Sequence, residues 1–263
     1  MNHTKPRHKI TILSLKEADL LEKLIVKHGA MITFNNIFTI TKPNLTRQET
    51  KNLAAKLVKN GWLMRIKRGL YSISELSSRG FMSVSPYVIS NKIISDSYIS
   101  FAWALQHYGF FDQMAKNIVS VSLKAHKSLL LENIEYKYVK TKPALFFGWN
   151  EVQIENYTVR IATPEKALID MINFHKSISS IDLVIEKLAA YKNDLNIKQM
   201  TEYLKKFPIT TIKIFGFIFD LLKIDSTSLH SMIKNKTSTH RMLKTSTRFN
   251  SKWRLYYDKH FDT

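Results

Sequence analysis

Basic and amide side chains recur at helical spacing between residues 47 and 59. Thr46, followed three residues later by Glu49, predicts the start of a helix, and Asn60-Gly61 predicts its end. Amide side chains can pair with adenine edges, and lysine reaches guanine acceptors or phosphate. For this helix considered by itself, a solvent-exposed face explains the pattern more simply than DNA contact does. The face carries no carboxylate and comprises Arg47 near its start, Gln48, Lys51, Asn52, Ala55, Lys56 and Lys59.

A hairpin with a cationic tip follows this helix. Met64 and Ile66 alternate with Arg65 and Lys67, which is the period of a half-buried strand. Arg68 and the glycine after it predict a tight turn, and residues 70–73 predict the return strand. In the DNA-binding mode of such a unit, the helix enters the major groove and the hairpin lies along the backbone. We therefore expect duplex DNA contacts from the basic helix face and from Arg65, Lys67 and Arg68.

Two further helices are predicted upstream, which completes a winged helix-turn-helix. Ser14 and Glu17 form a capping pair for a helix that ends at Gly29. Thr33 is expected to cap a short second helix, before a break at residues 42–44. Winged helices also serve as protein-binding modules, so a protein-interaction scaffold stays open as an alternative function.

The distribution of charge favours a polyanionic partner for the first third of the chain. The 263 residues carry a formal net charge of +19. Residues 1–84 hold 15 Lys/Arg against 5 Asp/Glu, residues 85–224 hold 17 against 13, and residues 225–263 hold 8 against 3. Both ends are therefore basic and the middle is nearly balanced, which a uniformly lysine-rich composition does not explain.

The fold class is predicted to be α+β. A winged helix-turn-helix over residues 1–78, with a linker at 77–80, precedes a mixed α/β domain over 85–263 whose later part is helical to about residue 224. Residues 225–263 are expected to be a basic tail that either contacts nucleic acid or an acidic partner, or is a solvated extension. The expected elements are a helix at 97–109, strands at 119–123, 134–139, 145–149 and 157–162, a helix from Thr163, helices at 181–191, 197–207 and 211–222, and a closing strand at 253–257.

The chain offers little for catalysis, so we expect no enzyme and no catalytic, cofactor or metal site. The nine histidines lack metal-ligand spacing. Glu135 and Lys137 match half of a nuclease motif, which leaves a nuclease as the least favoured alternative. Glu165 and Asp170 are interpreted as a first-turn helix charge and a surface residue.

Composition places the protein in the cytoplasm, away from membranes. Cysteine is absent, which excludes disulfides and thiolate chemistry. No apolar run approaches the roughly 20 residues that span a bilayer, and the basic N-terminal residues do not resemble a signal peptide.

Four motifs in order resemble the AbiEi family of antitoxins. They are residues 57–71, residues 97–105 with Tyr108 and Gly109, residues 142–148, and residues 159–170. The resemblance implies a protein encoded beside a nucleotidyltransferase toxin in bacterial abortive-infection (phage-defence) loci. In this family the winged helix represses the shared promoter and the C-terminal domain counters the toxin, with or without direct contact. The toxin's own motif, Gly-Ser followed by Asp-x-Asp, is absent here.

Overall fold

The computed structural model describes residues 12–75, 84–113, 115–235 and 237–262. It divides into two compact units, one of residues 1–95 with 153–158 and one of residues 96–152 with 159–263. The first unit thus extends beyond the expected boundary at residue 78, and it includes α4 (Pro86–Ile93). One reason is that the Lys67 ammonium donates a hydrogen bond of 2.5 Å to the Ile93 carbonyl. The linker expected at 77–80 lies outside the described residues.

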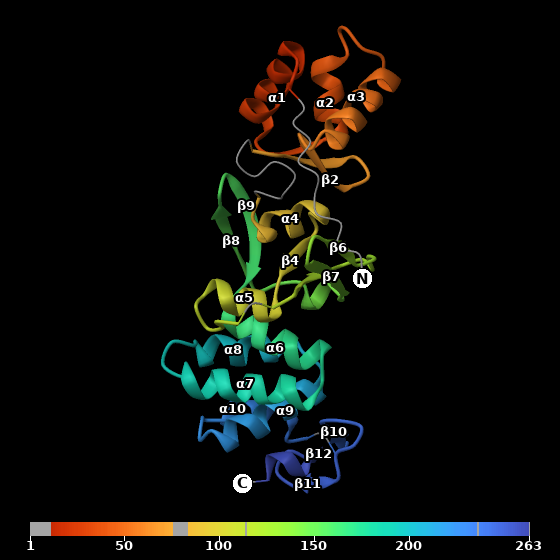
Figure 1. Ribbon diagram of the computed structural model, residues 1–263. Helices are drawn as coiled ribbons and strands as arrows, with labels where there is room; N and C mark the ends of the chain where they lie inside the picture. Colours follow the sequence, from red (N-terminus) through yellow and green to blue (C-terminus); the bar gives the residue numbers. More distant parts are fainter. Residues whose placement is uncertain (1–11, 76–83, 114, 236, 263) are drawn as a thin grey trace, which may run out of the picture. The chain divides into compact units, whose positions relative to one another are not determined.

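The first unit is a winged helix, as predicted. The capping boxes predicted at Ser14 and Thr46 are present, and the cap predicted at Thr33 is also a capping box, with Asn36. The short strand β1 had no sequence signal and joins the hairpin in a sheet of order β1-β3-β2. Its elements are α1 (Leu15–His28), β1 (Met31–Thr33), α2 (Phe34–Thr41), α3 (Arg47–Lys59), β2 (Leu63–Lys67) and β3 (Leu70–Ile73), shown in red to orange in Figure 1.

A single apolar core fixes the three helices on this sheet. Leu24, Ile32, Ile37 and Leu57 are fully buried, and they come from α1, β1, α2 and α3 respectively. Burial of aliphatic side chains of this size stabilises a fold by about 1.5–3 kcal/mol each. Helix α3 is therefore held by one face, and its opposite face is left for solvent or a ligand.

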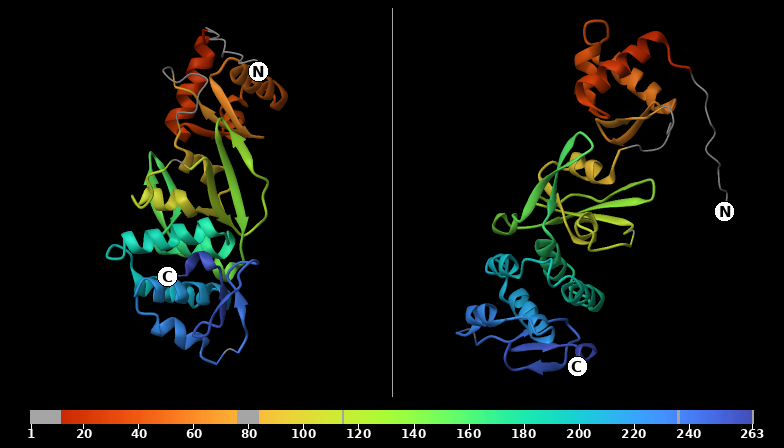
Figure 2. Two further views of the ribbon diagram at one scale, coloured as in Figure 1. Left: turned by 60° about the horizontal axis from the view of Figure 1, so that its bottom comes forward. Right: turned by 90° about the vertical axis from the view of Figure 1, so that its left-hand side faces the viewer.

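The second unit begins with a mixed six-stranded sheet of order β6-β7-β5-β4-β9-β8. Strand β4 pairs antiparallel with β5 and parallel with β9, and β5 pairs parallel with β7. Helices α6 to α9 lie between this sheet and the C-terminal part (Figures 1 and 2). The elements are β4 (Ser97–Ile99), α5 (Phe101–His107), β5 (Asn117–Ser122), β6 (Leu129–Leu131), β7 (Ile134–Lys140), the 3-10 turn Pro143–Leu145, β8 (Trp149–Ile154), β9 (Tyr157–Ala162), α6 (Pro164–Phe174), α7 (Ile178–Ala190), α8 (Ile197–Leu204) and α9 (Ile209–Leu221).

Two of the secondary-structure predictions for this unit are wrong. The helix predicted over 97–109 begins only at Phe101, because residues 97–99 form the buried strand β4 between β5 and β9. The strand predicted over 145–149 is a 3-10 turn that starts at Pro143, followed by irregular chain, and β8 begins at Trp149. In the first case, residues 97–99 have the spacing of a helix but pair with two strands from elsewhere in the chain. Local periodicity carries no information about such long-range pairing.

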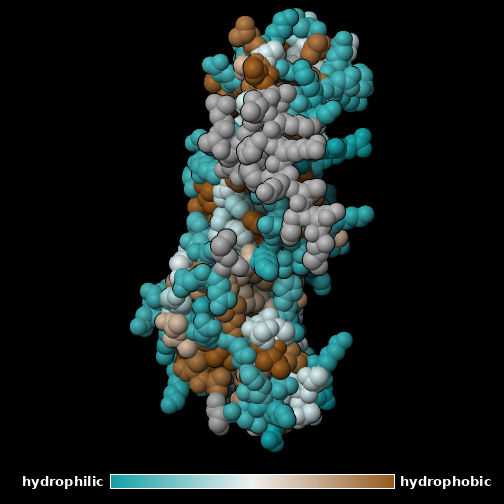
Figure 3. Space-filling view, in the orientation of Figure 1, coloured by the Kyte–Doolittle hydropathy of each residue, from teal (hydrophilic) through white to brown (hydrophobic). Residues whose placement is uncertain are grey.

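The C-terminal residues form a folded subdomain, which excludes the solvated extension that the sequence left open as one alternative. They comprise α10 (Thr227–Ile233) and a three-stranded sheet of order β10-β12-β11, made of β10 (His240–Arg241), β11 (Arg248–Asn250) and β12 (Leu255–Tyr257), before the 3-10 turn Lys259–Phe261. Strand β12 lies within the closing strand predicted at 253–257. Trp253 is fully buried and anchors the subdomain. On the face shown in Figure 3, hydrophobic and hydrophilic residues lie side by side over this C-terminal part, at the bottom of the picture.

Among the described residues, none of the helices has both the length and the apolar character that crossing a lipid bilayer requires.

Candidate nucleic-acid interface

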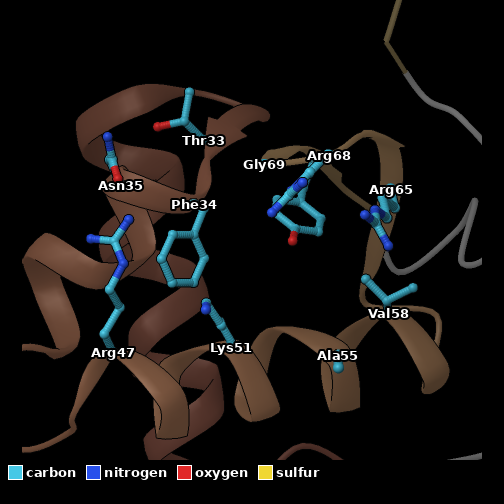
Figure 4. Close-up of a pocket in the computed structure, with 11 residues that line it drawn as sticks. Thr33, Phe34, Asn35, Arg47, Lys51, Ala55, Val58, Arg65, Arg68 and Gly69 are labelled. Atoms are coloured by element: carbon cyan, nitrogen blue, oxygen red, sulfur yellow. The ribbon is translucent and has the colours of Figure 1, made fainter.

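A hollow of about 830 Å³ lies between α2, α3 and the β2–β3 hairpin. We call it the wing groove. Arg47 and Lys51 enter it from α3, while Arg65 and Arg68 face it from the hairpin (Figure 4). No described residue that lines the groove is acidic. The lining residues are Thr33, Phe34, Asn35, Arg47, Lys51, Ala55, Val58, Arg65, Arg68, Gly69 and Tyr71.

Backbone contacts position the tip of the hairpin against α2. The Phe34 N–H donates a 2.9 Å hydrogen bond to the Gly69 carbonyl. Gly69 has φ +77°, a left-handed conformation that favours glycine and that the tight turn requires. The register of β2 shifts between Arg65 and Lys67, and such an irregularity re-aims side chains along a strand. The turn and the register shift together orient Arg65 and Arg68 toward the groove and Lys67 elsewhere.

Arg47 is held over an aromatic pair. Its guanidinium lies 5.2 Å from the ring centroid of Phe34 and 5.4 Å from that of Phe38. The two rings are themselves stacked, 6.3 Å apart. Because the guanidinium is attracted to the faces of both rings, Arg47 loses less side-chain entropy when it meets a phosphate or a base. The groove therefore combines pre-positioned positive charge with an aromatic wall.

Of the nine residues expected to contact DNA, four line the wing groove: Arg47, Lys51, Arg65 and Arg68. Three others lie beside it on the exposed surface of α3. The Gln48 amide donates to the Asn52 carbonyl oxygen over 3.1 Å, and both side chains are exposed, so this pair can open to meet base edges. Lys59 is also exposed, near the C-terminal end of the helix.

Lys56 and Lys67 are placed differently from the other seven. The Lys56 ammonium lies 2.9 Å from the Glu17 carboxylate on α1, although 61% of its side chain is exposed. The backbone N–H of Ser14, with help from Lys56, holds the pKa of Glu17 below its usual value, so this carboxylate stays charged. Lys67 is tied to the Ile93 carbonyl. Neither ammonium lines the groove, because each has a partner on another helix of the unit.

Phe34, Asn35 and Tyr71 also line the groove but were not among the predicted DNA contacts. The cap at Thr33 located the start of α2, but only the contact between Phe34 and Gly69 brings that start to the hairpin tip. Tyr71 stands opposite Arg65 in the β2–β3 register, which places both side chains on one face of the hairpin.

Among the described residues, no second carboxylate joins the half-match to a nuclease motif to make a metal site. Glu135 and Lys137 form an ion pair of 3.0 Å with each other on β7. Within the described residues, no group of three or more His, Asp or Glu side chains could hold a metal ion.

The interpretation of Asp170 as a surface residue is wrong. Asp170 and Lys166 are both fully buried on α6 and form an ion pair of 2.5 Å. Tyr98 and Ser100 donate hydrogen bonds of 3.0 Å and 2.9 Å to the same carboxylate. Glu165 is also buried, and it accepts a hydrogen bond from the Asn196 N–H. The sheet and α8 cover this side of α6, which its helical periodicity did not indicate.

Comparisons with known proteins establish the fold of this chain but no family. No family model matches it, and no curated protein matches its sequence. Among solved structures it is similar to the crystal structure of the RV2827C protein from Mycobacterium tuberculosis, with a TM-score of 0.69 and 10% sequence identity. The match covers 96% of this chain and 94% of that chain, so the two share an arrangement of elements over nearly their whole lengths.

Proposed function

We propose that this protein is a transcriptional autorepressor that binds its own promoter as duplex DNA through the wing groove. The observation that carries the proposal is the convergence of Arg47, Lys51, Arg65 and Arg68 on one hollow whose described lining has no carboxylate. Cations from a recognition helix and a wing that face one hollow without a carboxylate suit contacts to the phosphates of a duplex. Asn35, Gln48 and Asn52 supply amides for reading base edges.

The antitoxin role belongs to the same proposal and rests on the resemblance to the AbiEi family. In that role, the second unit counters a cognate nucleotidyltransferase toxin, and repression by the wing groove adjusts the supply of both proteins. The resemblance of residues 159–170 to the family's motif supports this part of the proposal.

Fluorescence anisotropy tests DNA binding by the full chain. The probes are its own upstream duplex and a scrambled duplex, at one physiological salt concentration. We expect the upstream duplex to bind at least about tenfold more tightly, which corresponds to about 1.4 kcal/mol. Equal and weak binding of both duplexes would contradict the proposal and favour a protein-binding scaffold.

A matched pair of variants assigns the contacts. Arg65→Ala with Arg68→Ala is expected to weaken binding of every duplex and to reduce the slope of log affinity against log salt by about 2, because each phosphate contact contributes roughly 0.9. Lys67→Ala is the control, since it removes a cation from the same hairpin that is tied to Ile93. If Lys67→Ala weakens binding as much as the double variant does, the wing groove is not the contact surface.

A further inference from the structure

The C-terminal sheet aligns three side chains across its strands. Arg241 on β10 stands opposite Tyr256 on β12, and Phe249 on β11 stands opposite the same tyrosine. Residues directly opposite on neighbouring strands project to the same face of a sheet. Arg241, Tyr256 and Phe249 therefore form one row, which we call the aromatic row.

The other face of this sheet is anchored to α9. The Tyr257 ring lies 4.8 Å from that of Phe217, and Leu255 is fully buried. Trp253, just before β12, is fully buried and donates a 2.7 Å hydrogen bond to Asp220 on α9. Because the sheet packs through this face, the aromatic row lies on the side turned away from α9.

Phe249 is the most exposed of the described Phe, Tyr and Trp side chains, with 48% of its surface accessible. Its ring centroid is 5.0 Å from that of Tyr256, at an angle of 50°. The Arg241 guanidinium lies 4.4 Å above the Tyr256 ring and donates a hydrogen bond to the Ser246 carbonyl, which holds it in place. The exposed Phe249 ring thus stands beside a tyrosine that carries a stacked planar cation, and flat groups can stack on such an exposed ring.

The C-terminal subdomain that carries the aromatic row holds both paired and unpaired cations. Arg248 pairs with Asp262, and Lys252 pairs with Asp220. Arg241, Lys244 and Arg254 are exposed and have no carboxylate partner within ion-pair distance among the described residues. These three cations give the subdomain unpaired positive charge, which attracts an anion, and the exposed ring of Phe249 suits an anion that also presents flat rings.

We infer that the aromatic row binds single-stranded nucleic acid, with bases stacked on Phe249 and on the Tyr256–Arg241 pair and phosphates held by Lys244 and Arg254. Stacking on an exposed ring requires unpaired bases, because a duplex hides their faces. An acidic protein would use the cations but would leave the rings without a matching partner. The aromatic row lies in the second unit and shares no residue with the wing groove, so this inference does not depend on the proposed repressor function.

Anisotropy of labelled oligouridylate and oligothymidylate of about 12 nucleotides, a length within the usual site size, tests the inference on the full chain. Phe249→Leu keeps an apolar side chain but removes the ring, and we expect affinity for both strands to fall about tenfold. Phe249→Trp is expected to keep or improve binding. Arg241→Lys, which preserves charge without the planar stack, is expected to weaken it. Leu130→Ala is the matched control, because Leu130 is another exposed apolar residue of the same unit, 68% accessible.

Measuring each variant with both the duplex and the single-stranded probes shows whether the two surfaces bind independently. Phe249→Leu should leave duplex binding unchanged, and the Arg65→Ala with Arg68→Ala variant should leave single-strand binding unchanged. Tighter binding of oligouridylate than of oligothymidylate would identify RNA as the ligand, and the reverse would identify DNA. The inference is overturned if neither strand binds, if Phe249→Leu and Arg241→Lys both bind as the unaltered chain does, or if polyglutamate displaces the strands at equal charge concentration.

Discussion

Lys166 and Asp170 form the most deeply buried ion pair of the described chain, with no solvent exposure on either side chain. Burial raises the pKa of Asp170 and lowers that of Lys166, and the attraction between the two groups opposes both effects. The ammonium also lies 5.3 Å from the ring centroid of Phe147 and 5.2 Å from that of Phe207. Each charge is therefore tolerated only because its partner is present.

Removing one member of this pair is expected to destabilise the second unit strongly. Asp170→Ala leaves a buried ammonium without a counter-charge and should lower the free energy of unfolding by about 3–5 kcal/mol. Urea denaturation followed by circular dichroism measures the change. Lys205→Ala, which breaks the exposed pair with Glu202, is the control and should cost less than about 1 kcal/mol. Similar losses in the two variants would show that the buried pair contributes no more than a surface pair.

The charge of Asp220 makes the stability of the fold depend on pH. Burial raises the pKa of this carboxyl, but hydrogen bonds from Lys252, Ser226 and Trp253 outweigh burial and lower the pKa below its ordinary value of 3.8. A carboxyl whose folded pKa is lowered stabilises the fold above its unfolded pKa, and that contribution is lost as the pH falls through the folded pKa.

The expected result is that Asp220→Asn destabilises the protein at about pH 6 more than at about pH 3, since the asparagine carries no charge at either pH. Urea unfolding of both proteins at the two pH values gives the comparison. A difference that stays constant between them would mean that the charge of Asp220 does not stabilise the C-terminal subdomain.

At the scale of elements, the contact between α9 and the chain before β12 depends on a glycine. A Cβ atom added at Gly216 would lie 2.2 Å from the indole ring of Trp253, which is fully buried. Alanine normally stabilises a helix interior by about 0.5–1 kcal/mol over glycine. Here the steric overlap is the larger effect, because the tryptophan has no free space into which to move.

We therefore predict that Gly216→Ala lowers the free energy of unfolding by about 1–3 kcal/mol, the usual range for overpacking a core. Thermal unfolding with near-ultraviolet circular dichroism reports both stability and the environment of the buried indole. In a double-mutant cycle, Gly216→Ala should cost less in a Trp253→Leu background than in the starting protein. A single variant that is more stable than the starting protein would show that the helix shifts to accommodate the methyl group.

At the scale of the whole molecule, the first unit is completed by a distant part of the chain. The Met31 N–H donates a 2.8 Å hydrogen bond to the Tyr157 hydroxyl, across 126 residues of sequence. The Lys92 ammonium lies 4.9 Å from the centroid of the same ring. Residues 153–158 thus belong to the compact unit formed by residues 1–95.

Tyr157→Phe removes the acceptor and leaves the Met31 N–H without this partner. We expect a loss of about 1–3 kcal/mol in the free energy of unfolding, together with faster hydrogen exchange at Met31. Amide exchange measured by nuclear magnetic resonance provides the test. Unchanged exchange at Met31 would mean that the hydrogen bond does not protect this strand.

The local chemistry of the sequence determined the elements of the first unit and the residue types of its candidate site. The caps at Ser14, Thr33 and Thr46 act within one helical turn, so the residue types and their spacing were enough to predict them. The basic face of α3 and the cationic hairpin depend on the same short-range periodicities. The sequence therefore predicted the winged helix, and it named four of the residues that line the wing groove.

Only the tertiary structure decided which of these cations remain available and which polar groups are buried. Lys56 and Lys67 have the same type and spacing as their neighbours, but Glu17 and the Ile93 carbonyl hold them from elsewhere in the chain. Asp170 has the local pattern of a surface residue, yet it is buried because Tyr98 and Ser100 reach it from about 70 positions away. Such contacts arise from packing between distant segments, so they cannot be predicted from the residues that neighbour them along the chain.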